Sequence, residues 1–245
     1  MIITLSGMIG SGKSTLTTIL SDYLGTPAYY ESVTDNPILK LFYKDPKRYA
    51  FLLQIYFLNT RFSSMKQALK TNNSIMDRSI YEDSLFFHTN ASLGRVGVGD
   101  DAKKEVSVYD NLLENMLEEI KGMPKKSPDL MIGIKVSYET MIKRINLRGR
   151  EFEQPKNDPG LVSYYNRLLD EYDKFFNGGY NASPILIIDG DKYDFVDNEE
   201  DREEVLNQIS DKLKSMGLLD SSFVGKEYSR NQVDNMLDKV QSVIV

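Results

Sequence analysis

Residues 7–14 carry the feature that most restricts the fold of this chain. Their sequence, GMIGSGKS, matches the pattern G-x-x-x-x-G-K-[ST] in full. An apolar run at residues 2–5 precedes it, and a helix-like segment from about Lys13 to Tyr23 follows it. Between a strand and a helix, such glycines let backbone N–H groups converge on phosphate oxygens, and the helix N-terminus adds a favourable dipole. The segment therefore predicts a phosphate loop that binds a nucleoside triphosphate.

The side chains of the phosphate loop have separate expected roles. Lys13 would hold the β- and γ-phosphates as a point charge, and Ser14 would ligate Mg²⁺. We therefore expect ATP and Mg²⁺ as cofactors. A GTPase would also need an Asn-Lys-x-Asp guanine reader and a D-x-x-G switch, and the sequence contains neither. The loop residues expected to contact the nucleotide are Gly7, Gly10, Ser11, Gly12, Lys13, Ser14 and Thr15.

Apolar runs and helix-like segments alternate along the chain, which is typical of a parallel sheet with crossover helices. The predicted fold class is therefore α/β. A further helix start is expected at residues 35–37, and a loop at 90–101. We predict strands at residues 2–5, up to 29–30, 74–76, 130–136 and 184–188, and helices at about 13–23, 45–70, 102–121, 137–148, 161–176 and 201–215.

A polar break after Gly217 divides the chain. Residues 1–216 are expected to form one domain around the phosphate loop, and residues 217–245 a C-terminal tail. Apolar residues in the tail recur at helical spacing, which predicts an amphipathic helix at about 231–244. That helix must bury its apolar stripe, either on its own body or on a partner subunit. The stripe consists of Val233, Met236, Leu237, Val240, Val243 and Ile244.

Composition removes several classes of mechanism. The chain contains no cysteine and one histidine, His88, which excludes cysteine nucleophiles and cysteine zinc sites and nearly excludes a Ser-His-Asp triad. The formal net charge is −6, so no overall basic field attracts nucleic acid or an acidic membrane. No run approaches the ~18–20 apolar residues of a membrane span, and Gly7 arrives before the apolar core of a signal peptide could develop. We expect a cytoplasmic protein that binds neither nucleic acid nor membrane.

Polar residues lie where three predicted strands end. Ligands gather at the carboxyl ends of parallel strands, and there the chain has the phosphate loop, Glu31 and residues 77–79, Asp-Arg-Ser. Phosphoryl transfer to a hydroxyl calls for a carboxylate near that hydroxyl, a metal-organising acid and cations on the transferring group. Glu31, Asp77 and Arg78 supply that set, although Glu31 alone would suit a solvated loop acid and Asp77-Arg78 a surface ion pair. Together they indicate a kinase of small metabolites.

A basic cluster at residues 144–153 fits the same chemistry. Arg144 and Arg148 lie on one face of a predicted helix, so both can reach a common anion. Arg150 and Glu153 follow in a loop. An arginine-bearing lid over ATP would exclude water and prevent hydrolysis.

The long helix at residues 45–70 carries two polar side chains on an otherwise apolar surface. Gln54 and Arg61 are seven residues apart and share a face. Gln54 could pair with the edge of a base through its amide. Alternatively, both side chains could lie at the solvent margin.

In their order and spacing, these residues resemble the deoxyribonucleoside kinase family, the deoxycytidine/deoxyguanosine kinase group with its bacterial deoxyadenosine/deoxyguanosine members. The resemblance covers roughly residues 1–215. It implies a P-loop kinase fold, with a five-stranded parallel sheet flanked by helices on both faces, and a homodimer. It rests on the phosphate loop, Glu31, Tyr43 with Gln54 and Arg61, Asp77-Arg78-Ser79 followed by Asp83 and Phe87, and the lid residues Arg144, Arg148, Arg150 and Glu153.

The resemblance also implies a role for each residue. Glu31 would be the general base at the 5′-hydroxyl of a deoxynucleoside, and Arg78 would steady that oxygen and the phosphoryl group. Asp77, where many family members have Glu, would organise Mg²⁺ with Ser14. The remaining contacts implied are lid arginines Arg144, Arg148 and Arg150 on phosphates, Tyr43 and Glu153 at the 3′-hydroxyl, Tyr164 beside the sugar, Gln54, Arg61 and Asp83 at the base edge, and Phe87 stacked on the base.

The implied reaction is transfer of the γ-phosphate of ATP to the 5′-hydroxyl of a deoxynucleoside. Family members that accept thymidine tend to have small or apolar residues in place of Arg61 and Asp83, so we expect deoxyadenosine first, then deoxyguanosine or deoxycytidine. One alternative is a nucleoside monophosphate kinase of the thymidylate type, whose acceptor phosphate Glu31 would repel. Another is a catalytically inactive nucleotide-binding subunit on the same fold.

Overall fold

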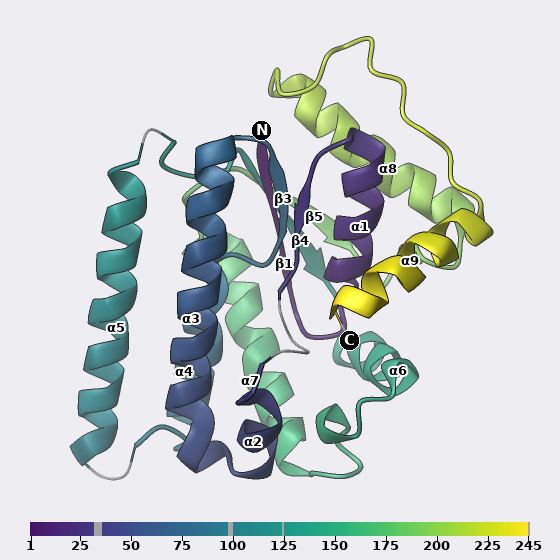
Figure 1. Cartoon of the computed structure of the whole chain (residues 1–245). Helices are drawn as coiled ribbons and strands as arrows, with labels where there is room; N and C mark the ends of the chain where they lie inside the picture. Colours follow the sequence, from purple (N-terminus) through teal and green to yellow (C-terminus); the bar gives the residue numbers. More distant parts are fainter. Residues whose placement is uncertain (32–35, 98–99, 124, 245) are drawn as a thin grey trace.

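The computed structural model describes residues 1–31, 36–97, 100–123 and 125–244. In this part of the chain, five parallel strands form one sheet in the order β2-β3-β1-β4-β5. Helices cover both faces of the sheet (Figure 1). The predicted α/β class and the five-stranded parallel sheet are therefore confirmed. The strands are β1 (Ile2–Gly7), β2 (Ala28–Tyr29), β3 (Ser74–Asp77), β4 (Leu130–Lys135) and β5 (Ile185–Asp189).

Strand β1 lies at the centre of the sheet, and all of its residues are buried. Its apolar start is what a strand covered on both faces requires. It pairs with β3 on one side, where Leu5 is opposite Asp77, and with β4 on the other, where Gly7 is opposite Ile134. The chain therefore leaves β1 between two neighbours, at the type of switch point where α/β sheets bind ligands.

The starts of the helices follow sequence signals. Asp45 caps α3 by accepting a hydrogen bond from Arg48 N at 3.2 Å, and Pro46 occupies the first helical turn. Ser137 Oγ caps α6 by accepting from Thr140 N at 3.2 Å. In the described residues the helices are α1 (Lys13–Leu24), α2 (Leu39–Lys44), α3 (Pro46–Thr71), α4 (Asp83–Ser92), α5 (Asp100–Lys121), α6 (Tyr138–Arg148), α7 (Gly160–Lys174), α8 (Glu199–Ser215) and α9 (Arg230–Ile244), with short helical turns at Ile80–Glu82, Glu151–Glu153 and Phe175–Gly179.

The structure departs from the sequence prediction at several element ends. Helix α4 was not predicted, and its last residues fall in the expected loop at 90–101. Its buried face includes the polar residues Asp83, Thr89 and Asn90, which hide the apolar stripe from a periodicity argument. Residues 98–99 of that loop, and residue 35 of the expected helix start, lie outside the described residues.

Apolar cores lie on both faces of the sheet. Helices α1, α8 and α9 pack with β1 and β4 in one core, and α3, α4 and α5 pack together in another. The tail helix α9 covers the residues where the amphipathic helix was predicted, and it crosses α1 in Figure 1. Val233 of α9 is fully buried on the chain's own body. None of the helices in the described parts of the chain has the length and hydropathy needed to cross a membrane.

Candidate active site

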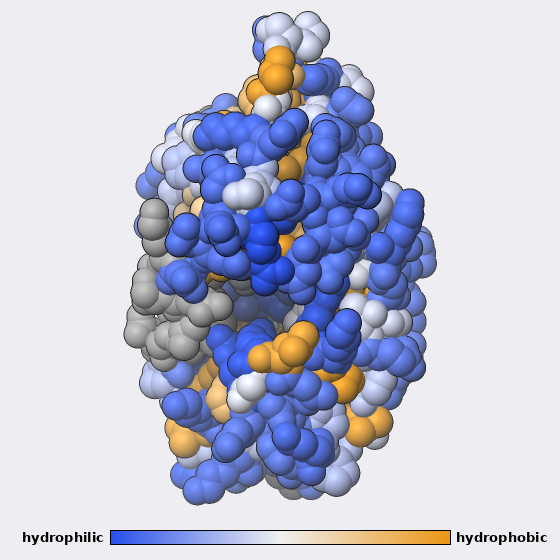
Figure 2. All heavy atoms as spheres, turned by 90° about the vertical axis from the view of Figure 1, so that its right-hand side faces the viewer, coloured by the Kyte–Doolittle hydropathy of each residue, from blue (hydrophilic) through white to orange (hydrophobic). Residues whose placement is uncertain are grey.

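A cleft of about 940 Å³ opens beside the phosphate loop and the end of β3. Figure 2 shows that the face carrying α8 and α9 is hollowed near its centre and is mostly hydrophilic around the hollow. The predicted site residues that line the cleft are Gly10, Gly12, Lys13, Ser14, Thr15, Glu31, Tyr43, Arg61, Asp77, Arg78, Arg144, Arg148, Arg150, Glu153 and Tyr164.

The glycines of the phosphate loop are required by its shape. Gly12 has a φ of 97°, in the left-handed region that favours glycine. A Cβ on Gly12 would lie 2.9 Å from the ring of Phe195, and one on Gly7 would lie 2.6 Å from Ile134 O. No side chain fits at either position without displacement of its neighbours. The loop is a backbone cradle of the kind that suits phosphate.

Lys13 is buried beneath this loop and has no carboxylate partner among the described residues. Its Nζ donates to Met8 O at 2.8 Å and to Ser11 Oγ at 3.4 Å. Burial, and then the positive charge of Arg78, lowers the pKa of Lys13 to about 7. The ammonium group is therefore bonded only to neutral oxygens, and a phosphate oxygen would be a much stronger partner.

Ser14 and Asp77 present a donor set that fits Mg²⁺. Ser14 Oγ donates to Asp77 Oδ2, while Asp77 Oδ1 is buried and has no hydrogen-bond partner in the part of the chain that the structure describes. Burial raises the pKa of Asp77, which indicates a carboxylate short of positive partners. In the described residues, no three His, Asp or Glu side chains gather as a metal cage. One carboxylate and one hydroxyl suit a Mg²⁺ that keeps waters and phosphate oxygens as its other ligands.

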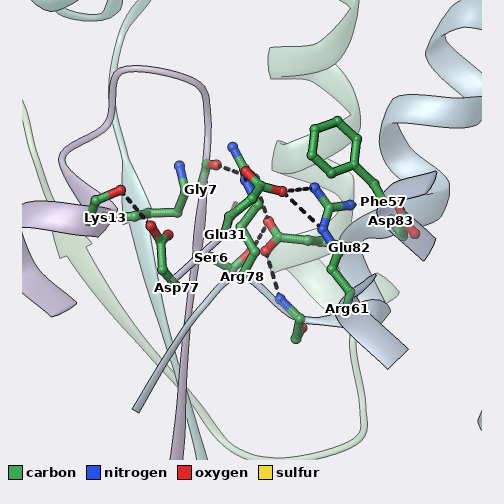
Figure 3. Close-up of polar contacts among 12 residues, drawn as sticks. Ser6, Gly7, Lys13, Glu31, Phe57, Arg61, Asp77, Arg78, Glu82 and Asp83 are labelled. Atoms are coloured by element: carbon green, nitrogen blue, oxygen red, sulfur yellow. Dashed lines mark hydrogen bonds and ion pairs between the residues drawn. The ribbon is translucent and has the colours of Figure 1, made fainter. Parts of the chain in front are cut away.

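Glu31 lies between two guanidinium groups. Its Oε1 accepts from Arg61 Nε at 3.1 Å and its Oε2 accepts from Arg78 Nε at 2.9 Å (Figure 3). Burial favours a higher pKa, but the charges of Arg61 and Arg78 outweigh it and hold the pKa of Glu31 at about 2. At neutral pH, Glu31 is consequently an ionised carboxylate with a fixed orientation on the wall of the cleft.

Arg78 adopts an unusual backbone conformation at the end of β3. Its φ is 75°, one of two positive values among the described non-glycine residues. The surroundings hold this conformation: Arg78 N donates to Leu5 O at 3.0 Å, and its Nη1 donates to Gly7 O at 3.2 Å and to Tyr172 Oη at 2.8 Å. Backbone strain of this kind persists where the environment over-determines it, often at functional sites. Here it directs the guanidinium back toward the phosphate loop.

Glu82 is a central member of the site that the sequence analysis did not identify. It is fully buried, and its Oε2 accepts from Ser6 Oγ at 2.9 Å, Arg78 Nη1 at 3.1 Å and Tyr172 Oη at 2.6 Å. Arg78 is thus bonded by two carboxylates: Glu82 on its buried side and Glu31 on the side of the cleft. The local sequence signals are the i,i+4 spacing of Arg78 and Glu82 and the capping-box pattern of Ser79 and Glu82, in which Ser79 N donates to Glu82 Oε1 at 3.3 Å.

Arg61 joins the predicted base-reading residues to Glu31. Its Nη1 donates to Asp83 Oδ1, and its guanidinium lies 4.8 Å from the centroid of the Phe57 ring. Asp83 is fully buried, and none of the described residues bonds its Oδ2. Burial raises the pKa of Asp83 to about 7, because Arg61 is shared with Glu31 and only partly compensates. Arg61 and Asp83 therefore form the pre-oriented pair expected from the sequence.

Phe87 does not occupy the position predicted for a base-stacking residue. It is fully buried and stacks on Tyr109 of α5, with ring centroids 3.8 Å apart. Phe86 lines the cleft instead, with the guanidinium of Arg78 4.8 Å from its ring centroid. Adjacent residues of a helix point about 100° apart. Phe86 therefore faces the cleft while Phe87 packs against α5.

Gln54 is buried one residue from the cleft wall. Its neighbours Leu53 and Phe57 line the cleft, whereas Gln54 does not. Gln54 is 2% exposed, and its Oε1 has no hydrogen-bond partner in the described residues. The prediction of a solvent-margin position is therefore wrong, and the amide retains an unused acceptor.

The lid residues are paired with one another. Arg148 Nη2 donates to Glu153 Oε2, and Arg150 Nη1 lies 3.5 Å from Glu153 Oε1. Glu153 is 4% exposed and Tyr165 Oη donates to its backbone O at 2.7 Å. Tyr43 lines the same part of the cleft, and burial, with Tyr165 next, raises its pKa well above the ordinary value. The Glu153 carboxylate and the Tyr43 phenol, the two groups expected to contact the sugar, thus line the same part of the cleft.

Arg144 is attached to the phosphate loop. Its Nη1 donates to Ser11 O at 2.9 Å and its Nη2 to Gly190 O at 2.8 Å. It therefore bridges the loop and the segment after β5, residues 190–197, which lines the cleft and was not singled out from the sequence. Apolar and aromatic residues at its centre, Tyr193 and Phe195, are the signal that could have identified it.

Comparison with known proteins identifies the family of the chain. A family model described as deoxynucleoside kinase matches residues 3–214. The chain is 58% identical to a deoxyguanosine kinase of Lactobacillus acidophilus, over 89% of this chain and 93% of the relative. It is 52% identical to a deoxyadenosine kinase of the same organism, over 89% and 99%.

Solved structures give the same grouping. The structure of deoxyadenosine kinase from M. mycoides with bound dATP superposes with a TM-score of 0.69 at 31% identity, over 85% of this chain and 99% of that one. The match to the family model and the identities above exceed what a shared fold alone would give, and this chain belongs to the deoxynucleoside kinase family.

Proposed function

We propose that this protein is an ATP-dependent deoxynucleoside 5′-kinase with a purine deoxynucleoside as acceptor. The observation that carries the proposal is Glu31, an ionised carboxylate held by Arg61 and Arg78 on the wall of the cleft that also contains the phosphate loop. Glu31 can accept a hydrogen bond from a substrate hydroxyl, and Arg78 beside it is a cation that can bind the phosphoryl group in transfer.

The charged residues have distinct parts in the proposed transfer. Lys13 and the backbone of the loop would bind the phosphates of ATP, and Arg78 would balance charge on the phosphoryl group as it moves. Glu31 would accept a hydrogen bond from the 5′-hydroxyl and orient its oxygen toward the γ-phosphate. A carboxylate with a pKa of about 2 is a weak base at neutral pH, so its main contribution is orientation until the proton becomes acidic late in the transfer. Mg²⁺ at Ser14 and Asp77 would shield phosphate charge.

The remaining cleft residues would recognise the deoxynucleoside. Tyr43 and Glu153 would bond the 3′-hydroxyl, Tyr164 would border the sugar, and Phe86 would contact the base in place of Phe87. The Arg61–Asp83 pair supplies donors and an acceptor beside the space left for the base. Gln54 Oε1 and Asp83 Oδ2 have no hydrogen-bond partner among the described residues but lie behind the cleft wall, so a shift of their side chains would bring these acceptors to an amino group of a purine.

The printed names of the relatives support a purine acceptor. Those at 58% and 52% identity are a deoxyguanosine kinase and a deoxyadenosine kinase, so both purines belong in the proposal. A homodimer and a cytoplasmic location, both expected from the sequence, are retained as part of it.

The decisive experiment is a substrate panel. Deoxyadenosine, deoxyguanosine, deoxycytidine, thymidine and their 5′-monophosphates are tested with Mg·ATP, and kcat/KM is measured for each. We expect the two purine deoxynucleosides to rank highest. Preferred turnover of a monophosphate would refute the proposal in favour of a monophosphate kinase, and no turnover of any acceptor would indicate a non-catalytic subunit.

A further inference from the structure

Helix α9 reaches the nucleotide cleft although it lies beyond residues 3–214 that the family model matches. Leu237 of α9 lines the cleft together with the phosphate loop. In Figure 1 the helix crosses α1 near the end where the phosphate loop enters it. The tail is therefore part of the cleft wall as well as part of the core.

Contacts at two places, on α1 and beside α8, attach the tail to the body of the protein. Tyr228 Oη donates to Asp22 Oδ2 on α1 at 2.8 Å. Arg230 N donates to Glu199 Oε1 at 2.8 Å, and the guanidinium of Arg230 pairs with Asp197. Asp197 itself lines the cleft, so the tail is tied to the residues that surround the nucleotide.

The same cleft segment is held from its other side by α8. Arg202 is 2% exposed and its Nη1 donates to Val196 O at 3.2 Å. Val196 and Asp197 are thus held by arginines from α8 and α9. This arrangement places the 193–197 segment, with Phe195 against Gly12, at the outer end of the phosphate loop.

The surroundings of Leu237 belong to the donor side of the cleft. Leu237 packs against the core that α1 and the 193–197 segment share. The proposed acceptor contacts come from other elements, α3 with Arg61, α4 with Asp83 and the lid with Glu153. A nucleoside triphosphate whose phosphates occupy the loop must place its nucleoside beyond one end of the loop. The apolar side chain of Leu237 lines the cleft at the end of the loop that is away from the proposed acceptor contacts.

We propose that α9 completes the donor site: Leu237 is an apolar wall for the base or ribose of the nucleoside triphosphate, and Arg230 positions the 193–197 segment beside it. This inference rests on the proposed function, because it assumes that the phosphate loop binds the phosphoryl donor. Leu237, in the tail, would then help to determine which nucleoside triphosphate the enzyme accepts as phosphoryl donor.

The test compares two neighbouring substitutions in the full-length protein. Leu237→Ala removes the wall, and Met236→Ala is the matched control, since Met236 packs on the same core without lining the cleft. Initial rates are measured with varied Mg·ATP at saturating purine deoxynucleoside, and then with varied deoxynucleoside at saturating Mg·ATP. For Leu237→Ala we expect KM for ATP to rise about three- to tenfold, while kcat and KM for the acceptor stay within about twofold.

Two more variants extend the test. Leu237→Met keeps an apolar side chain of similar size, so its KM for ATP should equal that of the wild type. Arg230→Gln removes the ion pair with Asp197, so it should raise the KM for ATP as Leu237→Ala does. If Leu237→Ala does not fold, as judged by circular dichroism, Leu237→Gln carries the same comparison.

The outcomes separate this inference from the proposed function. Equal KM values for ATP in Leu237→Ala and Met236→Ala, or a rise confined to the KM for the acceptor, would overturn it. A wild-type protein without kinase activity would refute the proposed function instead. In that case calorimetric titration with Mg·ATP still decides whether Leu237 contributes to nucleotide binding.

Discussion

Glu31 Oε2 accepts a hydrogen bond of 2.9 Å from Arg78 Nε, so the carboxylate proposed to orient the acceptor and the cation proposed to steady the phosphoryl group are joined before any substrate is present. Glu31 follows β2 and Arg78 follows β3, two neighbouring strands of the sheet. The spacing between Glu31 and Arg78 is thereby tied to the pairing of these two strands. Preorganisation of this kind is a large part of what a phosphoryl-transfer site can contribute.

Glu31→Gln tests the role of the carboxylate. The change preserves size but removes the charge and the second strong acceptor, so we expect kcat to fall about 100-fold or more, with little change in KM for ATP. Steady-state kinetics provide the measurement, and Glu118→Gln, on an exposed residue of α5, is the control. Near-normal turnover would remove Glu31 from the mechanism.

Lys13→Ala removes the ammonium group from the phosphate loop. We expect loss of phosphoryl transfer with an intact fold, since Lys13 bonds only Met8 O and Ser11 Oγ within the protein and the backbone of the loop is unchanged. Activity and circular dichroism are measured together, with Lys70→Ala as an exposed control. A purified variant that transfers phosphate at the wild-type rate would contradict the phosphate-loop assignment.

Glu82→Gln tests the support beneath Arg78. An amide cannot accept from Ser6, Tyr172 and Arg78 as a carboxylate does, so at least one buried donor loses its partner at a cost of about 1–3 kcal/mol. We expect kcat to fall at least about tenfold because Arg78 is less well held, with KM for ATP nearly unchanged. A purely structural role would lower the free energy of unfolding measured in urea and leave kcat of the folded enzyme as it was.

Asp83→Asn tests a pH dependence of stability. Burial raises the pKa of Asp83 to about 7, against about 3.9 in an unfolded chain. The folded state therefore retains a proton that the unfolded chain releases, which favours folding at low pH, and this contribution is lost as the pH rises through the folded pKa. We expect the free energy of unfolding to decrease less between about pH 5 and pH 8 in the variant than in the wild type.

The measurement is urea unfolding at the two pH values, with the exposed Asp211→Asn as control. If wild type and Asp83→Asn lose the same stability over this interval, Asp83 is ionised throughout it. Glu31 does not interfere, because its pKa of about 2 keeps it ionised across the interval.

The double variant Arg61→Met/Asp83→Ala tests base recognition. It removes both charges together, so neither is left unpaired in the cleft. We expect purine activity to fall, at a cost of about 1–3 kcal/mol for each lost hydrogen bond, and thymidine activity to rise because the cleared apolar volume accepts its methyl group. Each single variant should be poorer on thymidine than the double. A deoxyadenosine to thymidine ratio of kcat/KM that stays within about threefold, under ~1 kcal/mol, would show that the pair does not read the base.

The parts of the site that lie within one local motif were accessible from the sequence. The phosphate loop requires its glycines, Lys13 and Ser14 within eight consecutive residues, and the strand and helix around it have clear periodicity. Glu31, Asp77 and Arg78 follow from the rule that parallel strands end at one edge of the sheet. These residues do line one cleft.

The parts that depend on contacts distant in sequence were not accessible. Glu82 is a central residue because Ser6 and Tyr172 converge on it from β1 and α7, and no local pattern reveals that. The choice between Phe86 and Phe87 is decided by Tyr109 of α5, which stacks on Phe87. Periodicity predicted helix α9, but its position beside the cleft depends on ion pairs such as that of Arg230 with Asp197.

If Glu153 bonds the sugar and Arg148 bonds a phosphate, as proposed, their pairing would couple the binding of the two substrates. A sugar hydroxyl that bonds Glu153 competes with Arg148, and the phosphates of ATP are an alternative partner for the guanidinium it releases. Whichever ligand binds first must break this pair, and the second binds a site already opened. Linkage requires the same coupling free energy in either order, so each ligand should tighten the binding of the other. On this proposal, ATP bound without an acceptor would lack the Arg148 guanidinium, and its hydrolysis would be disfavoured.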